Sequence, residues 1–275
     1  MQNSPIGILD SGIGGVTVLK EIIKLLPNED YIYYSDSLHA PYGEKSKEDV
    51  INYVDSIVKF LISKNCKMII VACNTATAFA IKEIRDEYPD IDIIGIEPAY
   101  KMIHDFSYNK KTLVMATSGT IHSEKFLNLY HQYDNDNTIL LSCEKLATLI
   151  ENDDDGIEDY LREILPKEKI EAVVLGCTHY PLVKDIIQKI IGPVIFYDGG
   201  KGVAQHVKSI LDTKDLHSDK NSGMIYFIDS SSNEHKKDRF FQLLQKWLIH
   251  FFFLYFYVII TKGGNIYGKT RKRFK

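Results

Sequence analysis

The feature that most limits the folds open to this chain is its alternation of short apolar segments with longer amphipathic ones. The short segments are rich in β-branched and aromatic residues. They are apolar throughout, which is typical of parallel strands covered on both faces. The longer segments carry apolar residues at helical spacing. This alternation predicts a doubly wound α/β fold.

The boundaries of these elements follow from the same patterns. The expected strands are Ile6–Leu9, Tyr31–Tyr34, Met68–Ala72, Ile91–Ile94, Leu113–Ala116, Ile139–Leu141, Ala172–Leu175, Val194–Tyr197 and Ile225–Ile228. The expected helices are Val16–Leu26, Lys47–Ser63, Ala76–Tyr88, Glu124–His131, Ile157–Leu165, Leu182–Ile191 and Val203–Leu211. The acidic segment "ENDDDG" (151–156) is expected to be a solvated surface loop.

Two parts of the chain resemble each other. "GILDSGIGG" (7–15) is followed by "VACNT" (71–75), and "LVMATSGTI" (113–121) is followed by "VLGCTH" (174–179). Aligning Ser11 with Ser118 places Cys73 and Cys177 62 and 59 residues downstream. We interpret the pattern as an internal duplication, with chance similarity of short strand-turn-helix units as the alternative. The duplication predicts two pseudo-symmetric α/β domains, each contributing one cysteine to a shared cleft.

Composition and charge exclude several classes of protein. With 275 residues, 45% of them hydrophobic, the chain fits a folded globular protein. Its net charge is −4, but residues 262–275 hold six basic and no acidic residues, which leaves 27 basic against 37 acidic residues elsewhere. An acidic body argues against nucleic acid as a partner. The four cysteines lack disulfide or zinc spacing, and the start lacks a signal-peptide layout, so we expect a cytoplasmic protein with no metal.

Cys73 and Cys177 stand where catalytic side chains are expected. In open α/β sheets, ligands bind at the carboxyl ends of the strands, and both cysteines follow a strand and precede an expected helix. A helix N-terminus favours a thiolate, so we expect both thiols to be activated. Asn74, Thr75 and Thr178 add short hydrogen-bonding side chains suited to a small anion such as a carboxylate.

Two activated thiols in matching positions predict proton transfer rather than a single nucleophile. One thiolate would remove a proton from one face of a carbon, and the other thiol would donate a proton to the opposite face. His179, two residues after Cys177, can also give or take a proton near neutral pH. Such a pair inverts a stereocentre without a cofactor.

Each of these residues also has a purely structural interpretation. A buried cysteine is often only a small apolar residue, and this interpretation is preferred for Cys66 and Cys143, which lack the polar strand-end setting. His179 alone could cap a helix, and Asp10 could be an N-cap or could orient a thiol. The run 12–15 does not complete the dinucleotide motif G-x-G-x-x-G, because Thr17 occupies its last position. We interpret the run as a tight turn that lets a ligand approach the backbone.

Six motifs, taken together, resemble the glutamate racemases, a family that acts without pyridoxal phosphate. They are "ILDSGIGG", "SDSLHAPYGEKS", "ACNTATA", "GIEPA", "ATSGTI" and "LGCTHYPL", and they occur in the family's order over about residues 5–248. His179, directly after Cys-Thr, favours glutamate over the related aspartate racemases, which usually carry an acid there. The resemblance implies interconversion of L- and D-glutamate, which supplies D-glutamate for peptidoglycan.

The resemblance also implies roles for individual residues. Cys73 and Cys177 match the two catalytic thiols, with Asp10 assisting near Cys73 and His179 assisting near Cys177. Other positions match groups that hold the substrate's carboxylates and ammonium: Ser11, Pro41, Tyr42, Gly43, Asn74, Thr75, Thr117, Thr120 and Thr178. Asp36 matches an acid before the PYG turn, and Glu151 matches a family glutamate near the cleft. No cofactor is implied.

The family's architecture implies a domain division and an assembly. Residues 1–97 with 206–248 would form the first α/β domain, and 98–205 would form the second. The family commonly forms dimers, so the resemblance implies a homodimer. Two motifs depart from the family pattern: Ser35-Asp36 with His39 precede PYG, where many members have Gly-Asp and Arg, and "SCEKLATLIE" lacks the usual prolines. Neither departure involves the thiol pair.

Residues 249–275 form an apolar and then basic tail that the family pattern does not explain. The apolar run Trp247–Ile260 has 14 residues, fewer than the roughly 20 that a membrane span needs. Its basic end could bind an anionic membrane surface. We favour an added core or dimer-facing element, or an altered reading frame, over membrane contact.

Two further classes of function remain as alternatives. One is a related cysteine-dependent decarboxylase or isomerase that acts on a dicarboxylate with one or both thiols. The other is a non-catalytic binding or membrane-associated protein in which the tail matters more than the cleft.

Overall fold

The computed structural model describes residues 2–107, 109–133, 136–248, 255–262 and 265–273. The strands are β1 (Ile6–Asp10), β2 (Tyr31–Ser35), β3 (Met68–Val71), β4 (Asp92–Gly95), β5 (Thr112–Ala116), β6 (Thr138–Ser142), β7 (Ala172–Gly176), β8 (Ile195–Tyr197), β9 (Met224–Asp229), β10 (Tyr255–Lys262) and β11 (Asn265–Arg273). The α-helices are α1 (Val16–Leu25), α2 (Lys47–Ser63), α3 (Asn74–Glu87), α4 (Lys101–Phe106), α5 (Ser118–Ile121), α6 (Glu124–Tyr133), α7 (Leu146–Asn152), α8 (Ile157–Ile164), α9 (Lys184–Ile191), α10 (Gly200–Lys214) and α11 (Glu234–Leu248), with 3-10 turns η1 (Tyr42–Glu44) and η2 (Tyr180–Val183).

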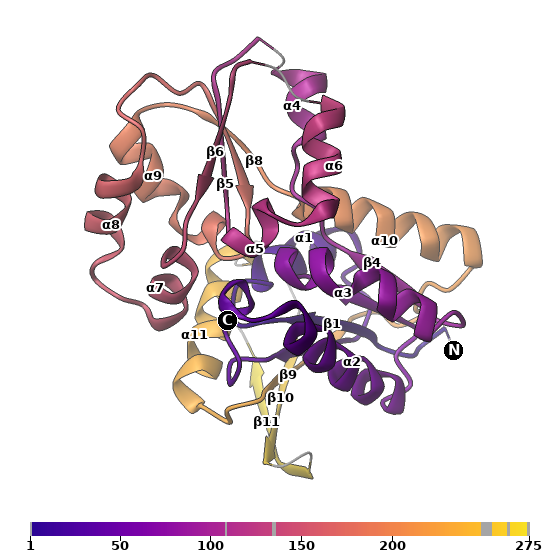
Figure 1. Ribbon diagram of the computed structural model, residues 1–275. Helices are drawn as coiled ribbons and strands as arrows, with labels where there is room; N and C mark the ends of the chain where they lie inside the picture. Colours follow the sequence, from indigo (N-terminus) through magenta and orange to yellow (C-terminus); the bar gives the residue numbers. More distant parts are fainter. Residues whose placement is uncertain (1, 108, 134–135, 249–254, 263–264, 274–275) are drawn as a thin grey trace.

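The strands form two sheets (Figure 1). The seven-stranded sheet has the order β11-β10-β9-β2-β1-β3-β4, and the four-stranded sheet has the order β6-β5-β7-β8. We call each sheet with its covering helices the first unit and the second unit. Apart from the antiparallel pair β10–β11, the paired strands are parallel. Parallel strands need crossover connections, and the helices between the strands provide them.

The two sheets repeat one strand order. In both units, the strand that comes first in the sequence lies between the second and the third, and the fourth lies beyond the third. The order is β2-β1-β3-β4 in the first unit and β6-β5-β7-β8 in the second, as a duplication predicts. The register corrects one detail of the alignment. Leu9 pairs with Val71 and Ala116 pairs with Gly176, so continuing each register places Ser11 beside Cys73 and Thr117 beside Cys177. Thr117, rather than Ser118, is therefore the counterpart of Ser11.

Helices cover both faces of the four-stranded sheet and of strands β9, β2, β1, β3 and β4 in the seven-stranded sheet, which makes each unit doubly wound. In the first unit, α1, α10 and α11 bury one face and α2 and α3 bury the other. In the second unit, α7, α8 and α9 cover one face, while α4 and α6 cover the other (Figure 1). Burial on both faces explains why these strands are apolar throughout. The predicted fold class is confirmed.

All nine predicted strands and seven predicted helices are present, with ends shifted by up to three residues. One start differs for a local reason: the predicted helix at Leu182 begins as the 3-10 turn η2, which contains Pro181, and α9 starts only at Lys184. The segment 151–156 is not a solvated loop throughout. Glu151 lies on α7 and is buried, because its carboxylate has partners inside the protein.

The two sheets define the two units, but the residue boundaries expected for the two domains stay a prediction. The boundary between 205 and 206 falls inside α10, and α10 packs on α1 in the first unit.

In the tail, β10 pairs in parallel with β9, and β11 closes a hairpin at the edge of the first sheet. Residues 249–254 of the apolar run lie outside the described residues. No helix in the described part of the chain is both long enough and apolar enough to cross a membrane.

A buried ion pair ties four distant segments of the first unit together. The Lys67 ammonium donates to Glu29 Oε2 at 2.6 Å, to the Leu216 carbonyl at 2.6 Å and to the Gln2 carbonyl at 2.8 Å. The other carboxylate oxygen of Glu29 accepts a hydrogen bond from the Ser218 amide at 2.8 Å. Both charged side chains are almost fully buried, at 1% and 2% exposure. Removing one partner would leave the other charge without compensation.

The Lys67→Met substitution should therefore destabilise the fold strongly, by about 3–5 kcal/mol, because the buried Glu29 carboxylate loses its cation. Urea unfolding followed by circular dichroism measures the change. The matched control is Lys59→Met, which removes an exposed ion pair with Asp55 on α2 and should leave the unfolding midpoint in place. Equal midpoints for the Lys67→Met variant and the wild type would contradict the assignment.

Candidate active site

The candidate site lies where the carboxyl ends of the central strands of both units meet. Asp10 ends β1, and Cys73, two residues after the end of β3, is the N-cap of α3. In the second unit, Thr117 is the N-cap of α5 after β5, and Cys177 follows β7. These are the strand ends at which doubly wound proteins bind their ligands. The repeated topology thus brings chemistry-bearing residues from both halves of the chain to one place.

The glycine-rich turn after β1 is held by Asp10. One carboxylate oxygen of Asp10 accepts hydrogen bonds from the backbone amides of Gly12 and Gly15, at 3.2 and 3.0 Å. The other oxygen accepts one from the Thr178 hydroxyl of the second unit at 3.2 Å. Burial raises the pKa of Asp10, while the charge of His179 and the two amide donors oppose that rise. Asp10 is therefore not the N-cap of α1; it holds the turn and meets the second unit.

The glycines of this turn allow a close approach, and the groups that approach are protein side chains. A Cβ on Gly12 would collide with Glu151 Oε2, and one on Gly14 would lie 2.5 Å from His179 Nδ1. Real Cβ atoms do not come this close, so only glycine admits both side chains. The sequence indicates an approach to the backbone here, and side chains of the second unit make such an approach, while the approach of a ligand stays a prediction.

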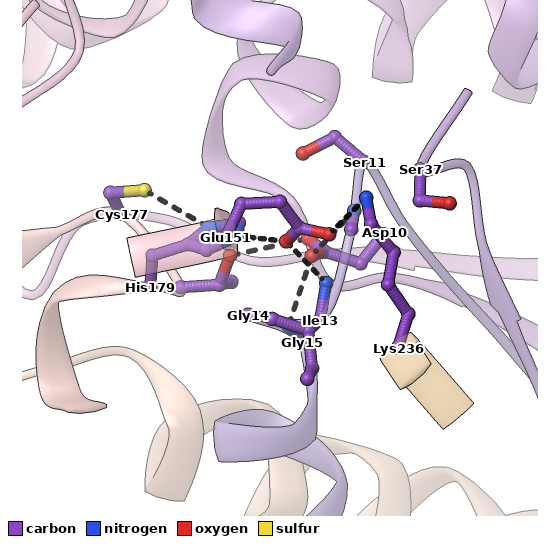
Figure 2. A network of polar contacts seen from close by, with 12 residues as sticks. Asp10, Ser11, Ile13, Gly14, Gly15, Ser37, Glu151, Cys177, His179 and Lys236 are labelled. Atoms are coloured by element: carbon purple, nitrogen blue, oxygen red, sulfur yellow. Dashed lines mark hydrogen bonds and ion pairs between the residues drawn. The ribbon is translucent and has the colours of Figure 1, made fainter. Parts of the chain in front are cut away.

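A chain of contacts leads from Cys177 to Glu151 (Figure 2). The Cys177 sulfur lies 3.8 Å from His179 Nδ1, and His179 Nε2 lies 2.8 Å from Glu151 Oε2. The same carboxylate oxygen accepts a hydrogen bond from the backbone amide of Ile13 at 2.9 Å. Glu151 is thus bound both by its own unit and by the glycine turn of the other.

The contacts predict a charged imidazole beside Cys177. Burial would lower the pKa of His179, but its contacts with Cys177 and Glu151 outweigh burial and hold that pKa well above the usual value. Burial would raise the pKa of Glu151, yet the hydrogen bond and charge of His179, with the charge of Lys236, lower it to about 2. At neutral pH the pair is therefore imidazolium and carboxylate. An imidazolium next to a sulfur favours a thiolate there.

Cys73 lies in a different environment, and the prediction that its helix N-terminus activates the thiol is wrong. Its sulfur accepts a hydrogen bond from the Ala76 amide at 3.5 Å and lies 3.7 Å from the Ser11 hydroxyl. Burial, followed by the charges of Asp10 and Cys177, nevertheless raises the pKa of Cys73 to about 12. Cys177 also differs from expectation, because the 3-10 turn η2, rather than an α-helix, follows it. Its cationic partner is His179.

Several predicted substrate-binding residues form a polar cluster between the units. The hydroxyls of Thr75 and Thr117 lie 3.0 Å apart, and Thr117 donates to Thr120 at 3.0 Å. Among the described residues, Asn74 is buried with no hydrogen-bond partner for its side-chain oxygen. A buried acceptor without a partner is costly, so a donor from a ligand is expected there.

The PYG segment forms one wall of a pocket of about 430 Å³ next to this cluster. Pro41, Gly43 and Thr117 line the pocket, together with Glu144 and Lys145. The Tyr42 hydroxyl turns away to donate to Asp36 at 2.6 Å, and His39 Nδ1 lies 2.9 Å from the same carboxylate.

The side chains of Asp36 and Tyr42, at the base of the PYG turn, have a structural role here. Asp36 holds the turn in place through Tyr42 and His39. Tyr42 is almost fully buried, and its hydroxyl is already engaged. Their matched roles in binding a substrate stay a prediction.

Two basic residues of α11 belong to the site and were not predicted. Lys236 donates to Glu151 Oε1 at 2.9 Å, and Arg239 donates to the Glu151 backbone carbonyl at 2.8 Å. They lie 85 and 88 residues from Glu151, outside the repeated motifs, so no local pattern marks them.

Cys66 and Cys143 are buried in apolar clusters, as expected. The described residues contain no group of three or more potential metal ligands.

Comparisons with known proteins agree with this geometry. The sequence profile of the Asp/Glu/Hydantoin racemase family matches residues 6–207. A glutamate racemase from Clostridium acetobutylicum is 42% identical over 252 residues, which cover 89% of this chain and 98% of the relative. The chain belongs to the Asp/Glu/Hydantoin racemase family, and the resemblance predicted from its motifs is confirmed.

Solved structures show the same similarity. A glutamate racemase isoform from Bacillus anthracis is 32% identical with a TM-score of 0.77, covering 90% of this chain and 95% of that one. The glutamate racemase of Francisella tularensis, solved in complex with D-glutamate, is 29% identical with a TM-score of 0.76, covering 95% of this chain and 98% of that one. The two-unit architecture is therefore shared over almost the full length of these proteins.

Replacing Glu151 with Gln should lower the pKa of His179, because the anion that stabilises the imidazolium is lost. His179 has a raised pKa in the folded protein. The charged pair therefore stabilises the fold below the unfolded pKa of about 6.5, and this contribution is lost as the pH rises through the folded pKa. NMR titration of the histidine side chains measures the midpoint, with the other eight histidines as internal references. An unchanged His179 midpoint would contradict the charge pairing.

Proposed function

We propose that this chain interconverts L- and D-glutamate by transferring protons at Cα between Cys73 and Cys177. The observation that carries the proposal is that the two cysteines follow equivalent strands of repeated units and differ in their acid–base partners. The relatives named glutamate racemase, and the Francisella tularensis complex with D-glutamate, support glutamate as the substrate. His179 after Cys-Thr favours the same choice.

The proposed reaction begins with a thiolate at Cys177. It removes the proton from Cα, so the Cα–H bond breaks, an S–H bond forms, and the electron pair left on carbon is delocalised into the adjacent carboxylate. The Cys73 thiol then gives its proton to the opposite face of Cα and becomes a thiolate. One turnover inverts the carbon and exchanges the protonation states of the two sulfurs. The thiols supply both base and acid, so this scheme requires no cofactor.

The environments of the two sulfurs support these starting roles. The imidazolium of His179 stabilises a thiolate at Cys177, whereas the raised pKa of Cys73 keeps its proton in place. Reaction in the opposite direction starts with the charge on Cys73. The Ala76 amide and the Ser11 hydroxyl are positioned to stabilise that charge.

Polar groups around the sulfurs would bind the substrate's charges. The free side-chain oxygen of Asn74 suits the α-ammonium, and the hydroxyls of Thr75, Thr117 and Thr120, with Ser11 and Thr178, suit carboxylate oxygens. In the cell, the product D-glutamate would serve peptidoglycan synthesis. This role supports a cytoplasmic location, and we propose that the enzyme acts there as a homodimer, as members of its family commonly do.

Chiral chromatography of purified protein with L-glutamate, without pyridoxal phosphate, tests the proposal. The wild type should form D-glutamate, and Cys73→Ala and Cys177→Ala should each lose at least about 100-fold in turnover, because each removes one proton-transfer group. Cys66→Ala is the matched control, since this buried thiol lies in the apolar cluster of the first unit, and it should retain activity.

Absence of racemisation by the folded wild type would overturn the proposal. Dependence on only one of the two cysteines would instead favour a one-thiol decarboxylase or isomerase. Glutamate binding without turnover would favour a non-catalytic protein.

A further inference from the structure

The Glu151 carboxylate has a third partner that the proposed chemistry does not yet use. Its Oε2 atom is bound by His179 and by the Ile13 amide, while its Oε1 atom accepts a hydrogen bond from the Lys236 ammonium at 2.9 Å (Figure 2). Lys236 comes from α11 of the first unit, and Glu151 comes from α7 of the second. The Lys236 side chain is 18% exposed and that of Glu151 is 4% exposed, so this ion pair is poorly screened by solvent.

Lys236 and Arg239 contact the same helix end in different ways. Arg239 binds the backbone carbonyl of Glu151 and the carboxylate of Asp153, so it holds the end of α7. Lys236 binds the carboxylate of Glu151 itself. Of these two residues, therefore, only Lys236 contacts the carboxylate, at the oxygen opposite the one that faces His179.

A buried carboxylate needs its hydrogen bonds both to stay ionised and to keep one orientation. If Oε1 lost its partner, only the contacts of Oε2 with His179 and the Ile13 amide would hold the carboxylate, and it could rotate more freely about its last side-chain bond. The charges that act on this group are those of His179 and Lys236, and Asp10 is close enough to interact with it electrostatically. His179 in turn faces Cys177, Glu151 and Asp10.

We propose that Lys236 is a positioning residue for the Cys177 half of the reaction. Bound to Oε1, it holds the Glu151 carboxylate against His179, and His179 stabilises the thiolate at Cys177. Lys236 is not among the contacts of Cys73, whose partners are Ser11 and Ala76. The chain of direct contacts from Lys236 leads through Glu151 and His179 to Cys177, so its effect should be larger at Cys177 than at Cys73. The catalytic role of Lys236 rests on the proposed racemisation, but its effect on the reactivity of Cys177 can be tested separately.

The test compares Lys236→Met with Lys236→Arg in the full chain. Loss of the ammonium should lower kcat for glutamate about tenfold or more, because a misplaced proton-transfer group reacts slowly. KM should change little, because Lys236 contacts none of the residues assigned to the substrate. Arg keeps the charge and a donor, so it should restore most of the rate. Lys237→Met is the matched control: Lys237 lies next in α11, pairs with Glu234 on its own helix, and should leave kcat unchanged.

The second readout is the alkylation rate of each cysteine by iodoacetamide at pH 7, measured by peptide mass spectrometry. Iodoacetamide reacts with thiolates, so the ratio of Cys177 to Cys73 alkylation reports the ionised fraction at Cys177. The ratio should fall in Lys236→Met, return in Lys236→Arg and stay constant in Lys237→Met.

The two readouts together decide whether Lys236 acts on Cys177. A fall in kcat together with selective slowing of Cys177 alkylation supports the proposal. An unchanged ratio, or a parallel rise at both cysteines as expected when the fold merely loosens, overturns it. If the wild type shows no racemisation, the proposed function fails, while the alkylation ratio still reports the effect of Lys236 on Cys177.

Discussion

The candidate site depends on one buried carboxylate that both halves of the chain share. Glu151 belongs to the second unit, but its oxygens are bound by the Ile13 amide and the Lys236 ammonium of the first unit as well as by His179. Burial would favour the neutral acid, and the surrounding donors and cations reverse that preference. The glycine turn must lack a side chain at position 12 for the carboxylate to fit. The same contacts therefore hold the two units together and keep His179 charged.

The two halves share a strand order but not an electrostatic environment. A symmetric site would treat both sulfurs alike. Here a buried thiol at a helix N-terminus faces an anionic neighbour, and the other thiol faces a charged imidazole. In the proposed mechanism, this difference defines a starting state in which one sulfur holds a proton and the other accepts one. An enzyme that inverts a carbon needs such a state before each turnover, and each turnover exchanges the roles.

Local sequence patterns predicted the strands, most helices and the strand-end location of both cysteines, because each of these is specified within a few residues. The chemistry at each sulfur depends on residues that meet only in the folded chain. Glu151 looks like the start of an acidic surface loop, yet it is buried, because its partners come from residues 13, 179 and 236. The sequence shows that Cys73 stands at a helix N-terminus. It does not show the burial, whose effect on the pKa of Cys73 outweighs that of the helix dipole. Lys236 and the edge pairing of β10 likewise depend on long-range contacts.

The central claim is that protons leave one face of Cα and return to the other through two different sulfurs. Racemisation in deuterated water, stopped at low conversion and analysed by mass spectrometry for each enantiomer, tests this most directly. The account predicts one solvent deuterium at Cα in nearly every product molecule and none in the remaining substrate, because the donating thiol has exchanged with solvent and the accepting thiol is a separate group. Deuterium in both enantiomers, or product that retains the substrate's own proton, would mean that a single base serves both faces, and the account would be wrong.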